Sequence, residues 1–380
     1  MAPAALLPTP VESPTTTITT TPTPPLPIPI TAPTVTGPTT KKATRPTHPL
    51  PRSLIENAQI PPHEKAPFTL SIHLAYAPPS KIHQMAEFGL EGAGISPNAI
   101  SEPFPLFTPE AIRQMRAEVF SPEVLENCRF RSSFCANMIR GMGHRRAPFI
   151  YDVWKSPDVL SKVSAAAGID LIPAFDYEIA NINVAVRDDD DVDDDYTSAN
   201  ANANTLAVKS VTADADAVPA FAWHYDSFPF VCVTMLSDCT NMIGGETAIR
   251  LPDGSIKKVR GPAQGYAVVM QGRYLEHQAL KALGGRERIS MVTPFRPRDA
   301  SVRDETILVG TRGISLLDEM YPQYFEYRME VLEERVRGVM RGERGREGAG
   351  RAFDVEGVRG WIREQREFLD SMLREMVVVE

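Results

Sequence analysis

The sequence predicts a mainly β protein with flanking helices, an α+β fold built around one central β core. Strand-like runs rich in Val, Ile and Phe dominate the middle of the chain, at residues 171–186, 229–237 and 289–295. Asp253 and Gly254 mark a hairpin between two further runs. Thr108 and Ser156 each stand directly before a proline, the order of an N-cap and a first helical residue. Apolar residues recur at helical spacing over 316–340 and 354–378.

These signals divide the chain into a tail and one domain. Residues 1–65 are dominated by Thr and Pro without apolar periodicity, so we expect a disordered tail. Residues 66–380 form a single domain with a β core at about 171–298 and C-terminal helices at 315–378. We expect these helices to pack outside the core; a dimer surface is the alternative.

An acidic run interrupts the strand pattern at residues 187–218, which hold Asp188 to Asp191 and Asp193 to Asp195. Such a run is typical of a solvated, flexible insertion. Calcium binding is the alternative, but the Gly and the terminal Glu of an EF-hand loop are missing.

Composition limits the function classes. The 380 residues carry 40 basic and 48 acidic side chains, a net charge of −8, and 43% of them are hydrophobic. We therefore expect neither nucleic acid nor an anionic membrane as a partner. The four Cys form no CxxC pair, which favours reduced thiols and a cytoplasmic protein. No apolar run reaches the length of a membrane span. Organelle targeting by the tail and the oligomeric state remain open.

The candidate site lies in the segment from Phe221 to Ser290. His224 and Asp226 are two residues apart, so on a strand their side chains would share one face, while Trp223 and Tyr225 would face into the packing. His277 follows in another strand-like region. Two His and one carboxylate with open positions opposite them form the facial triad of non-haem Fe(II) oxygenases.

A basic and a hydroxyl side chain follow the second His. Arg288 and Ser290 would share a face of the next strand. There the guanidinium and the hydroxyl could hold a carboxylate through charge-assisted hydrogen bonds.

The order HxD, distal His and RxS resembles the Fe(II)/2-oxoglutarate-dependent dioxygenase superfamily. The resemblance covers about the central fifth of the chain and includes Gly244-Gly245-Glu246-Thr247. It implies a double-stranded β-helix, or jelly roll, in which His224, Asp226 and His277 bind Fe(II). It also implies 2-oxoglutarate as cosubstrate, held by Arg288 and Ser290, with dioxygen as oxidant and succinate and CO2 as products. Related halogenases lack the Asp, so Asp226 favours hydroxylation or desaturation.

Two longer phrases, residues 223–231 and 270–274, resemble an uncharacterised group of fungal-type oxygenases that are often associated with specialised metabolism. The resemblance does not identify the substrate, which we expect to be a small organic molecule. Candidate substrate contacts are Phe228, Phe230 and Tyr274, which could equally be core residues. Arg273 could bind an anionic substrate or form an ion pair. Polar residues also occur upstream on a predicted strand: Asn181 and Asn183 could contact cosubstrate or substrate, or serve a structural role.

The same residues also fit several alternatives. The two His could be hydrogen-bonded core residues and Arg288 an ion-pair partner. A cupin-type metal site would need a second His in place of Asp226. The protein could also hydroxylate a protein side chain, or be a jelly roll that binds a ligand or partner without turnover.

Overall fold

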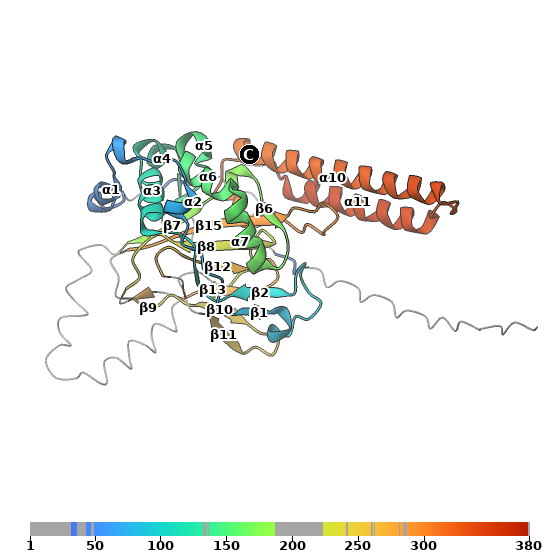
Figure 1. Ribbon diagram of the computed structural model, residues 1–380, viewed down its shortest axis with the longest axis horizontal. Helices are drawn as coiled ribbons and strands as arrows, with labels where there is room; N and C mark the ends of the chain where they lie inside the picture. The colour runs from blue at the N-terminus through green and yellow to red at the C-terminus, as the bar shows by residue number, and fades with distance from the viewer. Residues whose placement is uncertain are drawn as a thin grey trace, which may run out of the picture.

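The computed structural model describes residues 32–35, 43–46, 49–131, 135, 137–186, 223–240, 242–259, 261, 263–280, 282–283 and 287–378. Antiparallel sheets form its centre, helices cover one side of them, and a long helical hairpin projects away (Figure 1). The acidic run at 187–218 lies outside the described residues.

The large sheet has the strand order β1-β2-β12-β8-β15-β7-β5-β4, with β3 beside β12 and β6 beside β15. Its strands are β1 (Ile82–Gln84), β2 (Asn98–Ser101), β3 (Phe104–Pro105), β4 (Arg129–Phe130), β5 (Asn137–Ile139), β6 (Leu171–Pro173), β7 (Asn181–Val186), β8 (Phe230–Met235), β12 (Tyr266–Met270) and β15 (Glu287–Pro297). The first five strands precede residue 171, so the predicted β core of 171–298 was too narrow.

A smaller sheet has the order β11-β10-β13, and a two-stranded ribbon pairs β14 with β9. These strands are β9 (Ile243–Gly244), β10 (Thr247–Arg250), β11 (Ile256–Val259), β13 (His277–Ala279) and β14 (Ala282–Leu283). The hairpin predicted from Asp253 and Gly254 is confirmed: β10 and β11 pair antiparallel, and Gly254 takes a φ of +83° in the turn.

The helices before the sheets' central strands are α1 (Arg52–Ala58), η1 (Pro62–Glu64), α2 (Leu70–His73), η2 (Met85–Phe88), α3 (Pro109–Val119), α4 (Pro122–Asn127), α5 (Gly143–Arg146), α6 (Pro148–Lys155), α7 (Pro157–Ala167) and η3 (Asp176–Glu178). Those after the last strand are α9 (Val309–Arg312), α10 (Leu317–Gly348) and α11 (Val355–Glu375). Thr108 caps α3 by accepting a hydrogen bond from Ala111 N, as its position before Pro109 predicts.

The two faces of the large sheet have different neighbours because side chains alternate along a strand. On β8, Phe230 and Cys232 lie in the main hydrophobic cluster with residues of α3, α6 and α7. Val231 and Val233, one residue further along each time, line a cavity on the opposite face. The helices therefore bury one face, and the other face is left for the site.

The predicted tail boundary at residue 65 was wrong. Leu54 and Ala58 stand four residues apart in α1, so they share one face of that helix, and both are buried in the main cluster together with Leu50. The chain is therefore part of the folded domain from residue 50 at the latest, because Leu50, Leu54 and Ala58 pack against the main hydrophobic cluster.

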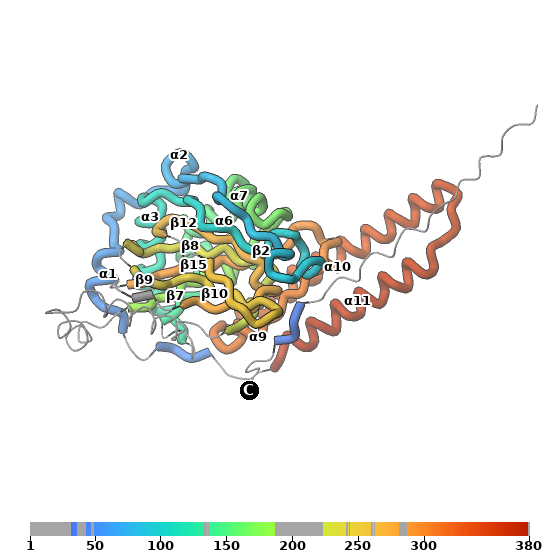
Figure 2. Tube along the Cα trace, turned by 90° about the horizontal axis from the view of Figure 1, so that it is seen from below, coloured from blue at the N-terminus to red at the C-terminus, as the bar shows by residue number. Residues whose placement is uncertain are grey.

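Helices α10 and α11 form a hairpin that extends from one side of the sheets (Figure 2). Near its base, the Arg328 guanidinium lies 3.5 Å from the ring centroid of Phe368 and donates to the Phe368 carbonyl and to Ser371 Oγ. The hairpin's first helix has 32 residues, but no helix of the described ranges is both long and apolar enough to cross a membrane.

A buried ion pair fastens the end of α11 to the body. The Glu375 carboxylate accepts hydrogen bonds from Arg312 Nη1 at 2.7 Å and from Leu308 N at 2.6 Å. Both Arg312 and Glu375 are buried. The partners of Glu375 belong to α9 and to the residue before it, so the C-terminal helix holds this segment in place.

We predict that Glu375→Leu lowers the free energy of unfolding by about 3–5 kcal/mol, because it leaves the Arg312 guanidinium buried without its counter-charge. The measurement is urea unfolding followed by circular dichroism. Glu333→Leu is the control, since Glu333 pairs with Arg337 on the exposed face of α10 and should matter by less than about 0.5 kcal/mol. Equal, small effects of both variants would contradict the anchoring role.

Candidate metal centre

The backbone brings the two predicted His ligands side by side. His224 and His277 form an isolated antiparallel bridge, in which each backbone N–H donates to the other's carbonyl at 2.9 and 3.0 Å. Since β13 pairs with β10 on its other edge, this bridge attaches His224 to the free edge of the small sheet. The two imidazole centroids are 4.3 Å apart as a result.

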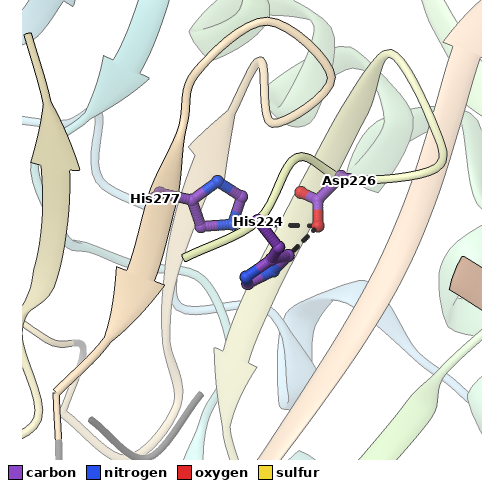
Figure 3. Close-up of side chains that lie close together, drawn as sticks. All are labelled: His224, Asp226 and His277. Carbon is purple, nitrogen blue, oxygen red and sulfur yellow. Dashed lines mark ion pairs between the residues drawn. The ribbon is translucent and has the colours of Figure 1, made fainter. Parts of the chain in front are cut away.

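Asp226 completes the group (Figure 3). Its backbone N–H donates to the Gly272 carbonyl at 2.9 Å. Its Oδ1 lies 3.6 Å from His224 Nε2 and 3.7 Å from His277 Nε2. These distances are too long for hydrogen bonds. Two ligand atoms that each lie about 2.1 Å from an ion can be at most about 4.2 Å apart, so the spacing suits a metal.

The polar atoms around the triad also fit a metal. His277 Nδ1 lies 2.9 Å from the Leu275 carbonyl; a proton on that nitrogen leaves Nε2 as the free lone pair. Asp226 Oδ2 is buried and has no hydrogen-bond partner among the described residues. His224, Asp226 and His277 form the one group of potential metal ligands of this kind found in the described part of the chain.

The electrostatics favour the ligating protonation states of His277 and Asp226. Burial lowers the pKa of His277, which favours the neutral imidazole. For Asp226 burial alone would raise the pKa, but the positive charge that His277 and His224 carry when protonated, together with the Arg273 guanidinium, outweighs it, so the pKa lies below its usual value. A neutral imidazole beside an ionised carboxylate is the donor set that a divalent metal requires.

The HxD segment is not the regular strand that the sequence predicted. His224 makes a single bridge, and Tyr225 and Asp226 are in irregular backbone. Trp223 and Tyr225 are consequently not in the packing: both line the same cavity as the triad. The Arg250 guanidinium lies 4.3 Å from the centroid of the Trp223 ring, a cation–π contact with this residue of the cavity wall.

That cavity has a volume of about 1220 Å³ and lies between the two sheets. The large sheet contributes apolar side chains of β8, β12 and β15, and the small sheet contributes Thr247, His277 and Ala279. Residues of α9 line another side; Gly310 N donates to Ser227 Oγ at 3.2 Å, directly beside Asp226. The metal centre is thus part of a large space with room for further molecules.

Arg288 and Ser290 line the same cavity from β15. Within the described residues, the Arg288 guanidinium has neither an ion pair nor a hydrogen bond. Burial lowers the pKa of Arg288. The neighbouring groups that raise this pKa are Cys239 and Cys135, and no carboxylate is among them. Arginine nonetheless stays protonated. In the described part of the chain this cation therefore has no counter-ion, which argues against an ion-pair role.

The structure places the four candidate substrate contacts differently. Phe228 lines the cavity. Phe230 lies on the helix-covered face of the sheet, and Tyr274 is packed in a second hydrophobic cluster with its hydroxyl donating to Glu305. Arg273 is buried, and its Nε donates to the Glu305 carbonyl at 3.1 Å. These last three thus contact the interior rather than the cavity.

Sequence reasoning missed another part of the wall. Arg140 and Glu178 form a buried ion pair that lines the cavity beside Asn181 and Asn183. The sequence offered one indication of this polar part of the wall, namely that Glu178 and Asn181 are polar residues within an otherwise apolar run. Nothing in the sequence indicates that Arg140, 38 residues earlier, reaches them.

Gly272 is required by the position of Asp226. A Cβ built on Gly272 would lie 1.8 Å from Asp226 Oδ2 and 2.6 Å from its Cγ. No side chain fits there unless the carboxylate moves.

We predict that Gly272→Ala weakens metal binding about 10–100-fold while the protein stays folded, because the added methyl displaces a ligand without removing it. Anaerobic titration with Co(II), followed by its visible absorption, measures the affinity. Gly360→Ala in α11 is the control, since a Cβ there meets nothing within 4 Å. Unchanged affinity in Gly272→Ala would show that Asp226 is not a ligand.

Comparisons with known proteins give structural neighbours only. No family model matches the chain. No curated protein matches it either. Solved structures that are similar to parts of the chain include an oxidoreductase of the 2OG-Fe(II) oxygenase family from Burkholderia pseudomallei, with 13% identity over 45% of this chain and 69% of that one and a TM-score of 0.29. The non-heme alpha-ketoglutarate-dependent epimerase SnoN from nogalamycin biosynthesis has 16% identity over 50% and 73%, with a TM-score of 0.33.

A Pseudomonas putida prolyl-4-hydroxylase is also similar, with 17% identity over 53% of this chain and 88% of that one and a TM-score of 0.30. These alignments are partial and their TM-scores lie below 0.5. A function for this chain must therefore come from the geometry of its own residues.

Proposed function

We propose that this protein is an Fe(II)- and 2-oxoglutarate-dependent oxygenase of the double-stranded β-helix class that oxidises a small organic molecule. One observation carries the proposal: a His-Asp-His group with metal-binding geometry lines the same cavity as a guanidinium that has no partner among the described residues. If the two His were only hydrogen-bonded core residues, their grouping with Asp226 would be unexplained. If Arg288 were only an ion-pair residue, its lack of a partner in the described chain would be unexplained.

The metal-binding role follows from the ligand types and their number. His224, Asp226 and His277 supply two neutral nitrogens and one carboxylate from one side, a set that suits Fe(II) and leaves positions open on the other side. Bound there, Fe(II) together with 2-oxoglutarate would supply oxidation by dioxygen, with succinate and CO2 as coproducts. Asp226 fills the third protein position, so we propose hydroxylation or desaturation.

Arg288 and Ser290 would hold the distal carboxylate of 2-oxoglutarate. They stand two residues apart on β15 and both line the cavity. The guanidinium offers parallel N–H donors and the Ser290 hydroxyl one more. Because this cation has no counter-ion in the described chain, an incoming carboxylate would gain charge-assisted hydrogen bonds without breaking an existing pair.

The sheets and α9 would limit the access of water to the reacting centre. Apolar side chains of three strands form much of the wall, and the α9 segment is fixed by Glu375 from α11. A substrate held in such a space exchanges water contacts for apolar ones, which favours a largely apolar small molecule.

The first test is an anaerobic titration of the purified apo-protein with Fe(II) and 2-oxoglutarate, followed through the weak visible charge-transfer band of the chelate. We expect the band with the wild type and its loss in His277→Ala, which keeps the fold but lacks a ligand. Metal binding without a band would shift the assignment to another metal-dependent oxygenase. No metal binding would favour a non-catalytic ligand-binding protein.

A second test concerns the cosubstrate. Arg288→Met should weaken 2-oxoglutarate binding by more than about tenfold, because hydrogen bonds to charged groups contribute about 1.5–3 kcal/mol. Fe(II) affinity should not change. Arg298→Met is the control, because Arg298 pairs with the exposed Asp170 just after the end of the same strand. If both variants bind 2-oxoglutarate like the wild type, Arg288 has no role in holding it.

A further inference from the structure

A second polar group, formed by Arg140, Glu178 and Asn181, lines the cavity that contains the triad. Arg140 Nη2 donates to both carboxylate oxygens of Glu178, at 2.6 and 2.8 Å. Asn181 Nδ2 donates to Glu178 Oε2 at 2.8 Å and to the Glu178 carbonyl at 3.1 Å. All three residues are at least nine-tenths buried. We call them the Arg140 cluster.

The Arg140 cluster is electrically neutral. The guanidinium and the carboxylate face each other in a low-dielectric surrounding, where breaking the pair would leave an uncompensated buried charge. A carboxylate or an ammonium group would have to compete with that pair, unlike at Arg288. The cluster is therefore unsuited to a charged ligand.

The cluster still has unused hydrogen-bonding capacity. Asn181 Oδ1 and Arg140 Nε are buried and have no hydrogen-bond partner among the described residues. The Asn181 amide cannot turn around without losing both bonds of its Nδ2. One free acceptor and one free donor remain there, and buried atoms of this kind normally have partners.

The register of the strands separates the cluster from the proposed cosubstrate anchor. Asn181 stands opposite Val292 of β15, whereas Ser290 stands opposite Asn183. Two residues along a strand correspond to about 7 Å. Both positions face the same cavity, whose walls nearby are apolar and include Phe228, Val231, Val292 and Pro294.

We propose that the Arg140 cluster is a substrate subsite for an uncharged hydrogen-bonding group, an amide or a hydroxyl, of an otherwise apolar molecule. This inference rests on the proposed function, because the triad gives the cavity its chemistry. The polar group binds Asn181 Oδ1 through its N–H or O–H, and the apolar body extends along the sheet towards the metal. The volume of about 1220 Å³ exceeds the roughly 300–1,000 Å³ of ordinary small-molecule sites, so cosubstrate and substrate fit together.

The test uses three probes with one apolar body: 4-phenylbutanamide, 4-phenylbutanoate and 4-phenylbutylamine. Their affinities for the full-length protein are measured by saturation-transfer NMR with 2-oxoglutarate present to occupy the Arg288 anchor. We expect the amide to bind at least tenfold more tightly than either ion. Equal affinities, or tighter binding of an ion, would overturn the proposal.

The orientation is tested with Mn(II), a paramagnetic ion that broadens nearby protons. The phenyl protons of the amide probe should broaden more than the protons next to the amide. Stronger broadening at the amide end, or none at either end, would exclude the cluster as its anchor. Should Mn(II) not bind at all, the metal-centre proposal fails, while the preference among the three probes still decides on the cluster.

Two variants tie the preference to these residues. Asn181→Leu should weaken the amide probe about tenfold, since its acceptor is gone. Glu178→Gln keeps the shape of the side chain but leaves the charge of Arg140 without a counter-charge. The affinity of the carboxylate probe should therefore rise relative to that of the amide probe. Glu333→Gln, which changes an exposed ion pair on α10, is the matched control and should alter neither. Thermal melts show which variants are folded. If a folded variant of either kind keeps the wild-type preference, the proposal is wrong.

Discussion

The site depends on one pair of backbone hydrogen bonds, those that join His224 to His277. They hold two chain segments 53 residues apart at strand distance, and the two imidazole centroids lie 4.3 Å apart. The N–H of Asp226 donates to the Gly272 carbonyl in the same way. Backbone pairing, which is independent of side-chain identity, thus sets the backbone positions of all three ligand residues, and Gly272 leaves the room that the carboxylate needs.

The alternation of the large sheet divides its side chains between a helix-covered core and the cavity, and this division marks the limit of sequence reasoning. The presence of strands at 171–186, 229–237 and 289–295 could be predicted from composition, as could the grouping of Arg288 with Ser290. Which face of a strand meets the helices could not, because both faces are apolar. Phe230 was therefore proposed as a substrate contact although its neighbour Val231 lines the cavity.

Contacts between distant segments were the other part that the sequence did not reveal. Arg140 and Glu178 are 38 residues apart and Arg312 and Glu375 are 63 apart, and neither pair has a local pattern that would identify it. The same holds for α1, in which two apolar residues within a polar, proline-rich region are buried against the main core. Local signals such as the Thr108 cap and the turn at Gly254 were sufficient because their partners lie within a few residues.

Buried polar side chains in this molecule differ in how far their hydrogen-bonding groups are already paired within the described chain. Arg312 and Arg328 are buried and hydrogen-bonded to carboxylate, hydroxyl or carbonyl oxygens. Arg288 is not hydrogen-bonded within the described chain, and the buried Asp226 Oδ2 and Asn181 Oδ1 also have no partner there. All three belong to residues that line one cavity. Leaving such groups unpaired costs free energy in the absence of ligand, and ligands that satisfy them recover it. In the functions proposed above, the Arg288 cation would bind the anionic cosubstrate and the Asp226 carboxylate would bind the metal. The Asn181 amide oxygen would accept a hydrogen bond from a neutral polar group of the substrate.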